Sequence, residues 1–158
     1  MKALLLPSLH LMLAYRLSHM LFGSRLTRPF SYVVYLISRI FYASDIHPAA
    51  RIGKGSHFVH HFNIVIGSTA VIGDNCTIFN GVTLGDNGKD RNLCPTIGDN
   101  VLLSAGSKVV GPVSVGSNSI VGANSVVIRD VPENSLAVGL PAVVKRTINR
   151  EDYYCFSC

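Results

Sequence analysis

The most constraining feature of the chain is a six-residue spacing of large aliphatic side chains that begins near residue 44. The spacing holds through two uninterrupted runs: Ile66, Ile72, Ile78 and Leu84, then Ile97, Leu103, Val109, Val115, Val121 and Val127. Ile46, Ile52 and Phe58 show the same step before a slip of two residues. Neither an α-helix nor an alternating strand has this period, so it predicts a parallel β-helix with coils of about 18 residues.

The residues between these aliphatics are those that a narrow coil needs. Small or modest side chains stand four positions after them, so each hexapeptide offers one large and one small residue to the interior. Glycine recurs one position after them, and IGDN or LGDN occurs at 72–75, 84–87 and 97–100. Gly, Asn and Asp tolerate positive φ, so we expect sharp corners at these positions.

Residues 1–43 carry a different, helical pattern. Leu9, Leu13, Arg16 and Met20 lie three or four apart, a break follows at 23–24, and the segment 30–43 is apolar almost all round. A helix of that kind must be covered, and we expect an oligomer partner rather than a membrane, although peripheral contact with the inner membrane stays open. The expected divisions are 1–43 (helical), 44–146 (β-helix) and 147–158 (tail).

Charge and cysteine usage limit the partners. Charged residues make up only 15% of the chain and the net charge is +5, which favours an anionic partner. The positive charges are scattered and no nucleic-acid motif is present, so we expect no nucleic-acid partner. Cys155 and Cys158 form one CxxC pair without a second pair nearby, so they predict no metal site.

Several motifs together resemble the hexapeptide-repeat acyltransferases, and serine O-acetyltransferases in particular. They are AYRLSH (14–19), DIHPAARIGKG (45–55), NIVIGSTAVIGDN (63–75), GVTLG (81–85), SAGSKVVG (104–111), IVGANSVVIRDVP (120–132) and AVGLPAVVKR (137–146). The resemblance implies a left-handed β-helix, acetyl-CoA as co-substrate, no metal, and a cytoplasmic homotrimer with active sites between subunits. It also implies that most of the family's long amino-terminal helical domain is missing here.

The stretch SHFVHHFN (56–63) holds three of the six histidines. By the resemblance, His60 is the general base and Asp45 its partner, since neutral imidazole can deprotonate a hydroxyl near pH 7 and a carboxylate can orient it. The interval of 15 residues allows the two to lie on adjacent coils. The related γ-class carbonic anhydrases bind zinc through histidines from separate coils, and no histidine follows His61, so we expect no zinc site.

Two departures from the family concern the acceptor. Val59 stands where serine acetyltransferases place an aspartate, and Cys94 stands where they place a second histidine, in a loop one residue shorter. Both changes remove polar groups that would hold an amino acid, so the expected acceptor is a sugar hydroxyl, as in acetyltransferases of capsule, colanic-acid and exopolysaccharide clusters. Serine stays an alternative if Asp90 or Arg91 restores its binding, and His61 is a further acceptor candidate. A non-enzymatic trimeric scaffold is the third possibility.

Coenzyme A should lie along a groove between neighbouring subunits. Candidates for contact with its pantetheine arm are Gly85, Ser104, Ala105, Gly106, Gly122 and Ala123. Lys108, Lys145 and Arg146 are candidates for its phosphates because they are cationic and lie in the final coils. Each glycine could equally serve only as a corner residue.

Overall fold

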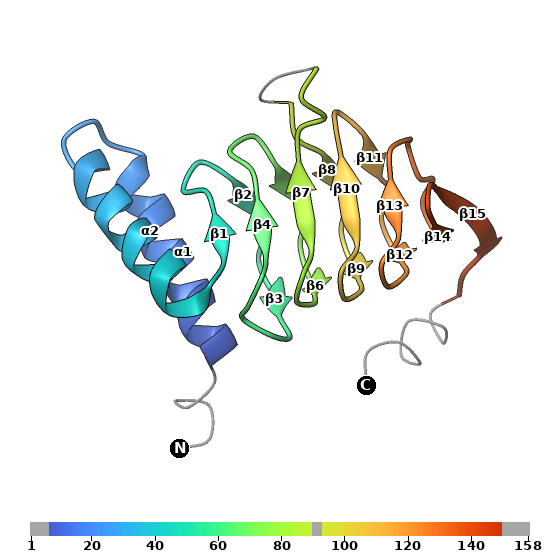
Figure 1. Cartoon of the computed structure of the whole chain (residues 1–158), viewed down its shortest axis with the longest axis horizontal. Helices are drawn as coiled ribbons and strands as arrows, with labels where there is room; N and C mark the ends of the chain where they lie inside the picture. The colour runs from blue at the N-terminus through green and yellow to red at the C-terminus, as the bar shows by residue number, and fades with distance from the viewer. Residues whose placement is uncertain (1–6, 90–92, 150–158) are drawn as a thin grey trace.

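The computed structural model describes residues 7–89 and 93–149. Its first two elements are the helices α1 (Pro7–Phe22) and α2 (Arg28–Tyr42), which pack side by side at the amino-terminal end of a long prism of short strands (Figure 1). The break expected at residues 23–24 is therefore confirmed, and so is the helical interpretation of the apolar segment that follows. No helix in the described part of the chain has the length and apolar character needed to cross a membrane.

The prism has three faces, each formed by one sheet of short strands. Sheet 1 contains β1 (Asp45–Ile46), β4 (Val65–Ile66), β7 (Thr83–Gly85), β10 (Lys108–Val110) and β13 (Val126–Val127). Sheet 2 contains β2 (Arg51–Ile52), β5 (Val71–Ile72), β8 (Thr96–Ile97) and β11 (Ser114–Val115). Sheet 3 contains β3 (His57–Phe58), β6 (Thr77–Ile78), β9 (Leu102–Leu103), β12 (Ile120–Val121), β14 (Ser135–Gly139) and β15 (Ala142–Thr147). All pairs are parallel except β14 with β15, so the predicted parallel β-helix is confirmed.

The coils are regular except at two places. Asp45, Val65, Thr83, Lys108 and Val126 form one column of sheet 1, so successive coils span 20, 18, 25 and 18 residues. The two extra residues of the first coil lie between β3 and β4, in the segment 59–64. The seven extra residues of the third coil lie between β7 and β8, in the segment 86–95. Both segments hold residues that the sequence nominates for the active site.

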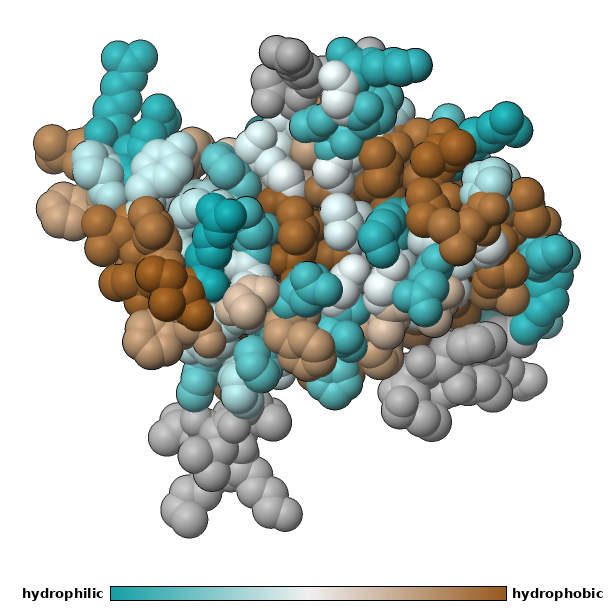
Figure 2. Space-filling model, viewed as in Figure 1, coloured by the Kyte–Doolittle hydropathy of each residue, from teal (hydrophilic) through white to brown (hydrophobic). Residues whose placement is uncertain are grey.

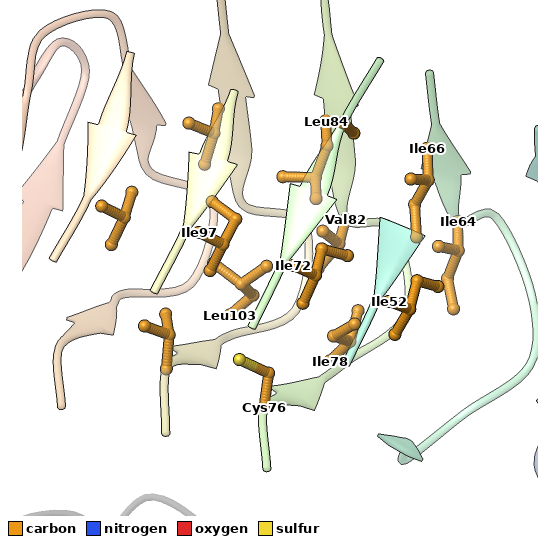
Figure 3. Close-up of a cluster of buried hydrophobic side chains, with 14 of the residues drawn as sticks. Ile52, Ile64, Ile66, Ile72, Cys76, Ile78, Val82, Leu84, Ile97 and Leu103 are labelled. Atoms are coloured by element: carbon orange, nitrogen blue, oxygen red, sulfur yellow. The ribbon is translucent and has the colours of Figure 1, made fainter. Parts of the chain in front are cut away.

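The core is the stack of inward aliphatic side chains that the period predicts (Figure 3). Ile72 lies in register between Ile52 below and Ile97 above, and all three are almost fully buried. Cys76 fills one of the small inward positions with no exposed surface. Each buried Ile or Leu contributes about 1.5–3 kcal/mol, so the repeated stack supplies the main stabilisation of the prism.

The corner chemistry differs in one respect from the expectation. The left-handed backbone angles fall on asparagines, such as Asn75 and Asn118 (φ 56° and 58°), rather than on the glycine that follows each large aliphatic. That glycine is needed because the coils approach closely: a Cβ on Gly73 would lie 2.7 Å from the carbonyl carbon of Gly98. In the IGDN motif, the glycine therefore allows stacking and the asparagine makes the turn.

Candidate active site

His60 lies on the edge where sheet 3 passes into sheet 1, which we call the His60 edge (residues 59–64, 79–82, 104–107 and 122–125). Its side chain is exposed, and the rings of Phe62 and Phe79 flank it at centroid distances of 6.2 Å and 6.3 Å. Within residues 7–89 and 93–149, neither ring nitrogen of His60 has a hydrogen-bond partner. The imidazole is therefore accessible and both of its nitrogens can meet a ligand.

Asp45 lies close to this segment in the backbone, yet its carboxylate is held by helix α2. The Asp45 amide donates to the Ile64 carbonyl at 2.7 Å, and the Ser44 hydroxyl donates to the His61 carbonyl at 2.8 Å. These bonds place the two segments on adjacent coils, as the interval of 15 residues predicts. The carboxylate, however, accepts a hydrogen bond from the Tyr35 hydroxyl and pairs with Arg39 at 3.2 Å. A direct bond between Asp45 and His60 stays a prediction.

The contact with Asp45 affects the pKa of Tyr35. Burial first, and then the hydrogen bond to the Asp45 carboxylate, raise the pKa of Tyr35 to about 12. Tyr35 therefore keeps its proton at neutral pH and acts as a hydrogen-bond donor to Asp45. The Arg39 pair is half-exposed, so we assign it a small contribution to stability.

His47 is a residue of this region that the sequence reasoning missed. The rings of Phe22, Tyr32 and Tyr35 surround its imidazole at 6.0–6.3 Å, and its Nδ1 accepts the Ala49 amide at 3.0 Å. Burial lowers the pKa of His47, while the nearby Asp45 charge opposes the shift. The signal was available in the DIHP motif, but an imidazole two residues from a carboxylate does not reveal which helix covers it.

The residues proposed to contact the acceptor separate into two groups. Val59 and His61 are half-buried on the His60 edge, where the Val59 amide donates to the Ile78 carbonyl at 2.9 Å. Cys94 lies on the opposite edge of sheet 1, where its amide donates to the Thr69 hydroxyl at 3.0 Å. Asp90 and Arg91 lie outside the described residues. One chain therefore does not bring the two extra segments together, because sheet 1 separates them.

Most of the proposed coenzyme residues do share the His60 edge. Backbone hydrogen bonds link its levels: the Gly106 amide donates to the Asn80 carbonyl, and the Asn124 amide donates to the Ala105 carbonyl, both at 2.9 Å. Ser104, Ala105, Gly106, Gly122 and Ala123 therefore stack along the same edge as His60. The Lys108 ammonium donates to the Gly106 carbonyl at 3.0 Å and is exposed beside this edge. Lys145 and Arg146 are exposed on β15 at the far end of sheet 3.

The glycines proposed to contact coenzyme A differ in whether the fold alone requires glycine at their positions. Gly106 has φ +70°, and a Cβ there would lie 2.2 Å from the Asn124 side-chain oxygen, so the corner alone requires glycine. A Cβ on Gly122 would lie 2.5 Å from a methyl of Val138, so packing requires glycine there too. Gly85 has an ordinary φ, and among the described residues only one heavy atom lies near its would-be Cβ, the Thr83 methyl at 3.9 Å. The open space at Gly85 is therefore available to a ligand or a second subunit.

Two further features lie apart from His60. A shallow hollow of about 300 Å³ is lined by Ala49, Arg51 and residues 68–71, on the same edge as Cys94. His57, the third histidine of the cluster, lies in β3 with an exposed side chain. The described ranges 7–89 and 93–149 contain no group of three or more His, Cys, Asp or Glu residues arranged to hold a metal ion.

Comparison with known proteins finds hexapeptide-repeat transferases and serine acetyltransferases. The family models "Bacterial transferase hexapeptide (six repeats)" and "Hexapeptide repeat of succinyl-transferase" match residues 94–129 and 63–89. A serine acetyltransferase of Staphylococcus aureus (strain Mu50 / ATCC 700699) is 52% identical over 112 residues, 70% of this chain and 53% of the relative. One of Bacillus pumilus (strain SAFR-032) is 41% identical over 148 residues, 90% of this chain and 68% of the relative. The chain thus spans about half the length of the first of these relatives.

Solved structures show the same similarity. A serine acetyltransferase in complex with coenzyme A from Brucella abortus strain S19 has a TM-score of 0.88 at 38% identity, covering 92% of this chain and 58% of that chain. The soybean serine acetyltransferase apoenzyme has a TM-score of 0.82 at 43% identity, covering 85% of this chain and 56% of that chain. These similarities support the expected left-handed hand of the β-helix.

Proposed function

The chain belongs to the serine acetyltransferase family of hexapeptide-repeat transferases, and from that membership we propose that it transfers an acetyl group from acetyl-CoA to a hydroxyl group. Serine is the first candidate acceptor, because the relatives at 52% and 41% identity are named serine acetyltransferases. The observation that carries the proposal is the placement of an exposed His60 on the same edge as the backbone of residues 104–106 and 122–123.

In this proposal His60 acts as general base. Its neutral imidazole takes the proton of the acceptor hydroxyl while the oxygen forms a bond to the thioester carbonyl carbon. The imidazolium then returns that proton to the departing thiolate of coenzyme A, so the proton count closes and His60 is regenerated. A base near neutrality suits this cycle because it is unprotonated before attack and can give up its proton afterwards.

Asp45 is proposed as the residue that orients His60. The bonds from Ser44 to His61 and from Asp45 to Ile64 hold its backbone against the segment that carries the base. To reach the imidazole, the Asp45 carboxylate would turn from the Tyr35 hydroxyl, or share with His60 its second oxygen, which pairs with Arg39 at 3.2 Å, while Tyr35 keeps the first. Tyr35 and Arg39 would then set the position from which the carboxylate works.

Coenzyme A is proposed to lie along the His60 edge. Such a ligand needs backbone groups for its pantetheine amides and cations for its phosphates. The edge offers the polar backbone of residues 104–106 and 122–123, with Lys108 beside it. Gly85 ends β7 at the opposite edge of sheet 1, so it would reach this coenzyme only from a second subunit. Lys145 and Arg146 at the far end of sheet 3 are proposed to meet the phosphates.

A homotrimer would complete the site. Cys94 and His60 stand on opposite edges of sheet 1, so only a second copy can bring a Cys94 segment to a His60 edge. The outward side of sheet 1 presents apolar groups suited to such contact, including Val65 and Ile128, which are 38% and 51% exposed. This face is turned toward the viewer in Figure 2 and shows apolar patches between its polar residues.

A sugar hydroxyl is the second candidate acceptor. Val59 beside the base and Cys94 in the inserted segment offer no charge to an amino acid's ammonium or carboxylate. Phe62 and Phe79 flank His60 and present rings on which the apolar face of a sugar can stack. A sugar acceptor is the one expected if the chain is more closely related to the acetyltransferases of exopolysaccharide clusters.

The test is a thiol-release assay with acetyl-CoA and either serine or a panel of sugar acceptors. His60→Ala should lower kcat by about 10²–10⁴-fold, the usual contribution of a general base. His57→Ala, which removes an exposed histidine three residues away, is the matched control and should keep full turnover. Unchanged turnover in His60→Ala would exclude it as the base. Absence of acetyl-CoA binding by calorimetry would favour a non-enzymatic scaffold.

A further inference from the structure

Helix α2 packs the opposite way from an ordinary surface helix. Its buried residues are two serines, Ser31 and Ser38, whereas its large apolar residues face outward. The outward set with exposures above one half comprises Phe30, Val33, Leu36, Ile37, Ile40 and Phe41. A helix in a water-soluble protein usually buries such a stripe, so this face of α2 lacks its partner in the isolated chain.

The apolar stripe points away from the prism. At 100° per residue, the six outward residues fall within an arc of about 140°. Tyr35 and Arg39 lie on the other side of the helix, where they contact Asp45. The two buried serines lie between the apolar arc and the Tyr35–Arg39 side, and Ser31 exchanges hydrogen bonds with Ser18 of α1. The whole arc is therefore free to meet a flat surface at the end of the molecule.

Helix α1 extends this surface. It buries Leu11, Tyr15 and Ser18, and its Arg16 guanidinium donates to the Ile52 and Gly53 carbonyls at 2.6 Å. Its exposed apolar residues, spaced three or four apart, are Leu9, Leu13, Leu17 and Met20. Figure 2 shows apolar side chains at the helical end of the molecule. The apolar end face is thus built from both helices.

The charges of this region have one sign. Residues 1–44 contain five Lys and Arg residues and no Asp or Glu. Arg25 and Arg28 are exposed at the loop between the helices, next to Leu26, which is 84% exposed. An apolar face bordered by cations complements a surface that offers hydrocarbon below a layer of anionic headgroups.

We propose that the apolar end face formed by α1 and α2 binds an anionic phospholipid bilayer, lying in the interface without crossing it. Large apolar residues outward and hydrogen-bonded serines between the helices are the arrangement that helices adopt in lipid, where small residues allow close packing. The alternative occupant, a second copy of the same face, would place the exposed Arg25 and Arg28 of both copies in one interface whose helices carry no acidic residue to pair them. The charge pattern therefore favours lipid over self-association.

The test uses the full chain carrying Phe41→Trp. The chain has no tryptophan, so this variant places one reporter on the proposed face. Vesicles of phosphatidylcholine alone are compared with vesicles containing about one third phosphatidylglycerol. We expect a blue shift of the emission and co-sedimentation with the anionic vesicles, weakened by salt. Adding Ile37→Asp should weaken binding about tenfold or more, whereas Leu140→Asp, at a still more exposed apolar site outside the helices, should not.

Three results would overturn the proposal. The first is failure to bind anionic vesicles, or equal binding to neutral ones. The second is equal vesicle binding by the Ile37→Asp and Leu140→Asp variants. The third is blue-shifted emission before vesicles are added, together with a fall in particle mass caused by Ile37→Asp, which would show that a second copy covers the face.

Discussion

Replacing Gly85 by alanine tests whether coenzyme A occupies the open space beside sheet 1. Nothing in the part of the chain that the structure describes requires glycine there, since φ is ordinary and the nearest described heavy atom to an added Cβ is 3.9 Å away. Alanine in place of a strand glycine should therefore raise the free energy of unfolding by about 0.5–1 kcal/mol. If the pantetheine arm uses this space, the same methyl group should cost about 1.4 kcal/mol of coenzyme binding, or about tenfold in KM for acetyl-CoA.

The measurements are urea unfolding and steady-state thiol release over a range of acetyl-CoA concentrations. Gly116→Ala is the matched control, because its Cβ would lie 2.3 Å from the Glu133 amide nitrogen on a different edge of the prism. That variant should lose stability and keep its coenzyme KM. The reasoning is refuted if Gly85→Ala leaves this KM unchanged. It is also refuted if the substitution lowers the mass of the oligomer, since the space would then belong to a neighbouring subunit.

Two further predictions concern the corner asparagines and the partly buried His47. Asn118→Ala should lower the free energy of unfolding by about 1–2 kcal/mol because alanine is strained at φ 58°. Asn118→Gly should lower it far less, because glycine adopts this φ without strain. Urea unfolding measures both variants, and equal losses would contradict a backbone cause. The pKa of His47 is lowered in the folded chain, so the unfolded chain binds a proton first and stability should fall as pH drops below 6.5. His47→Asn keeps an acceptor for the Ala49 amide and should flatten the curve of Tm against pH below pH 6.5. An unchanged slope would mean that another group causes the pH dependence.

The β-helix was predictable because its inward residues obey a local rule. Ile72, for example, is followed six residues later by Ile78, and both are buried as the period requires. The slip before Ile66 and the break before Ile97 were equally visible, and they mark the two inserted segments. The stack of identical coils leaves few alternatives for such a pattern, so spacing alone fixed the register of most strands.

The local geometry of the site was less predictable, because it depends on contacts between distant segments. The Asp45 carboxylate meets Tyr35 and Arg39 because α2 folds back on the first coil, and no spacing rule reports that contact. The separation of Cys94 from His60 follows from which edge each insertion occupies, which requires counting strands through three sheets. The burial of Ser31 in place of its apolar neighbours depends on its hydrogen bonds to Ser18 across the helix pair.

The 20- and 25-residue coils show how such a prism tolerates change. Each coil is held mainly by its two neighbours, so an edge can take extra residues while the strands above and below keep their pairing. Lengthening a surface loop adds only slowly to the entropy cost of closing it. An edge segment such as 59–64 can therefore change in sequence or length while the aliphatic stack beneath it, which supplies the stability, stays the same.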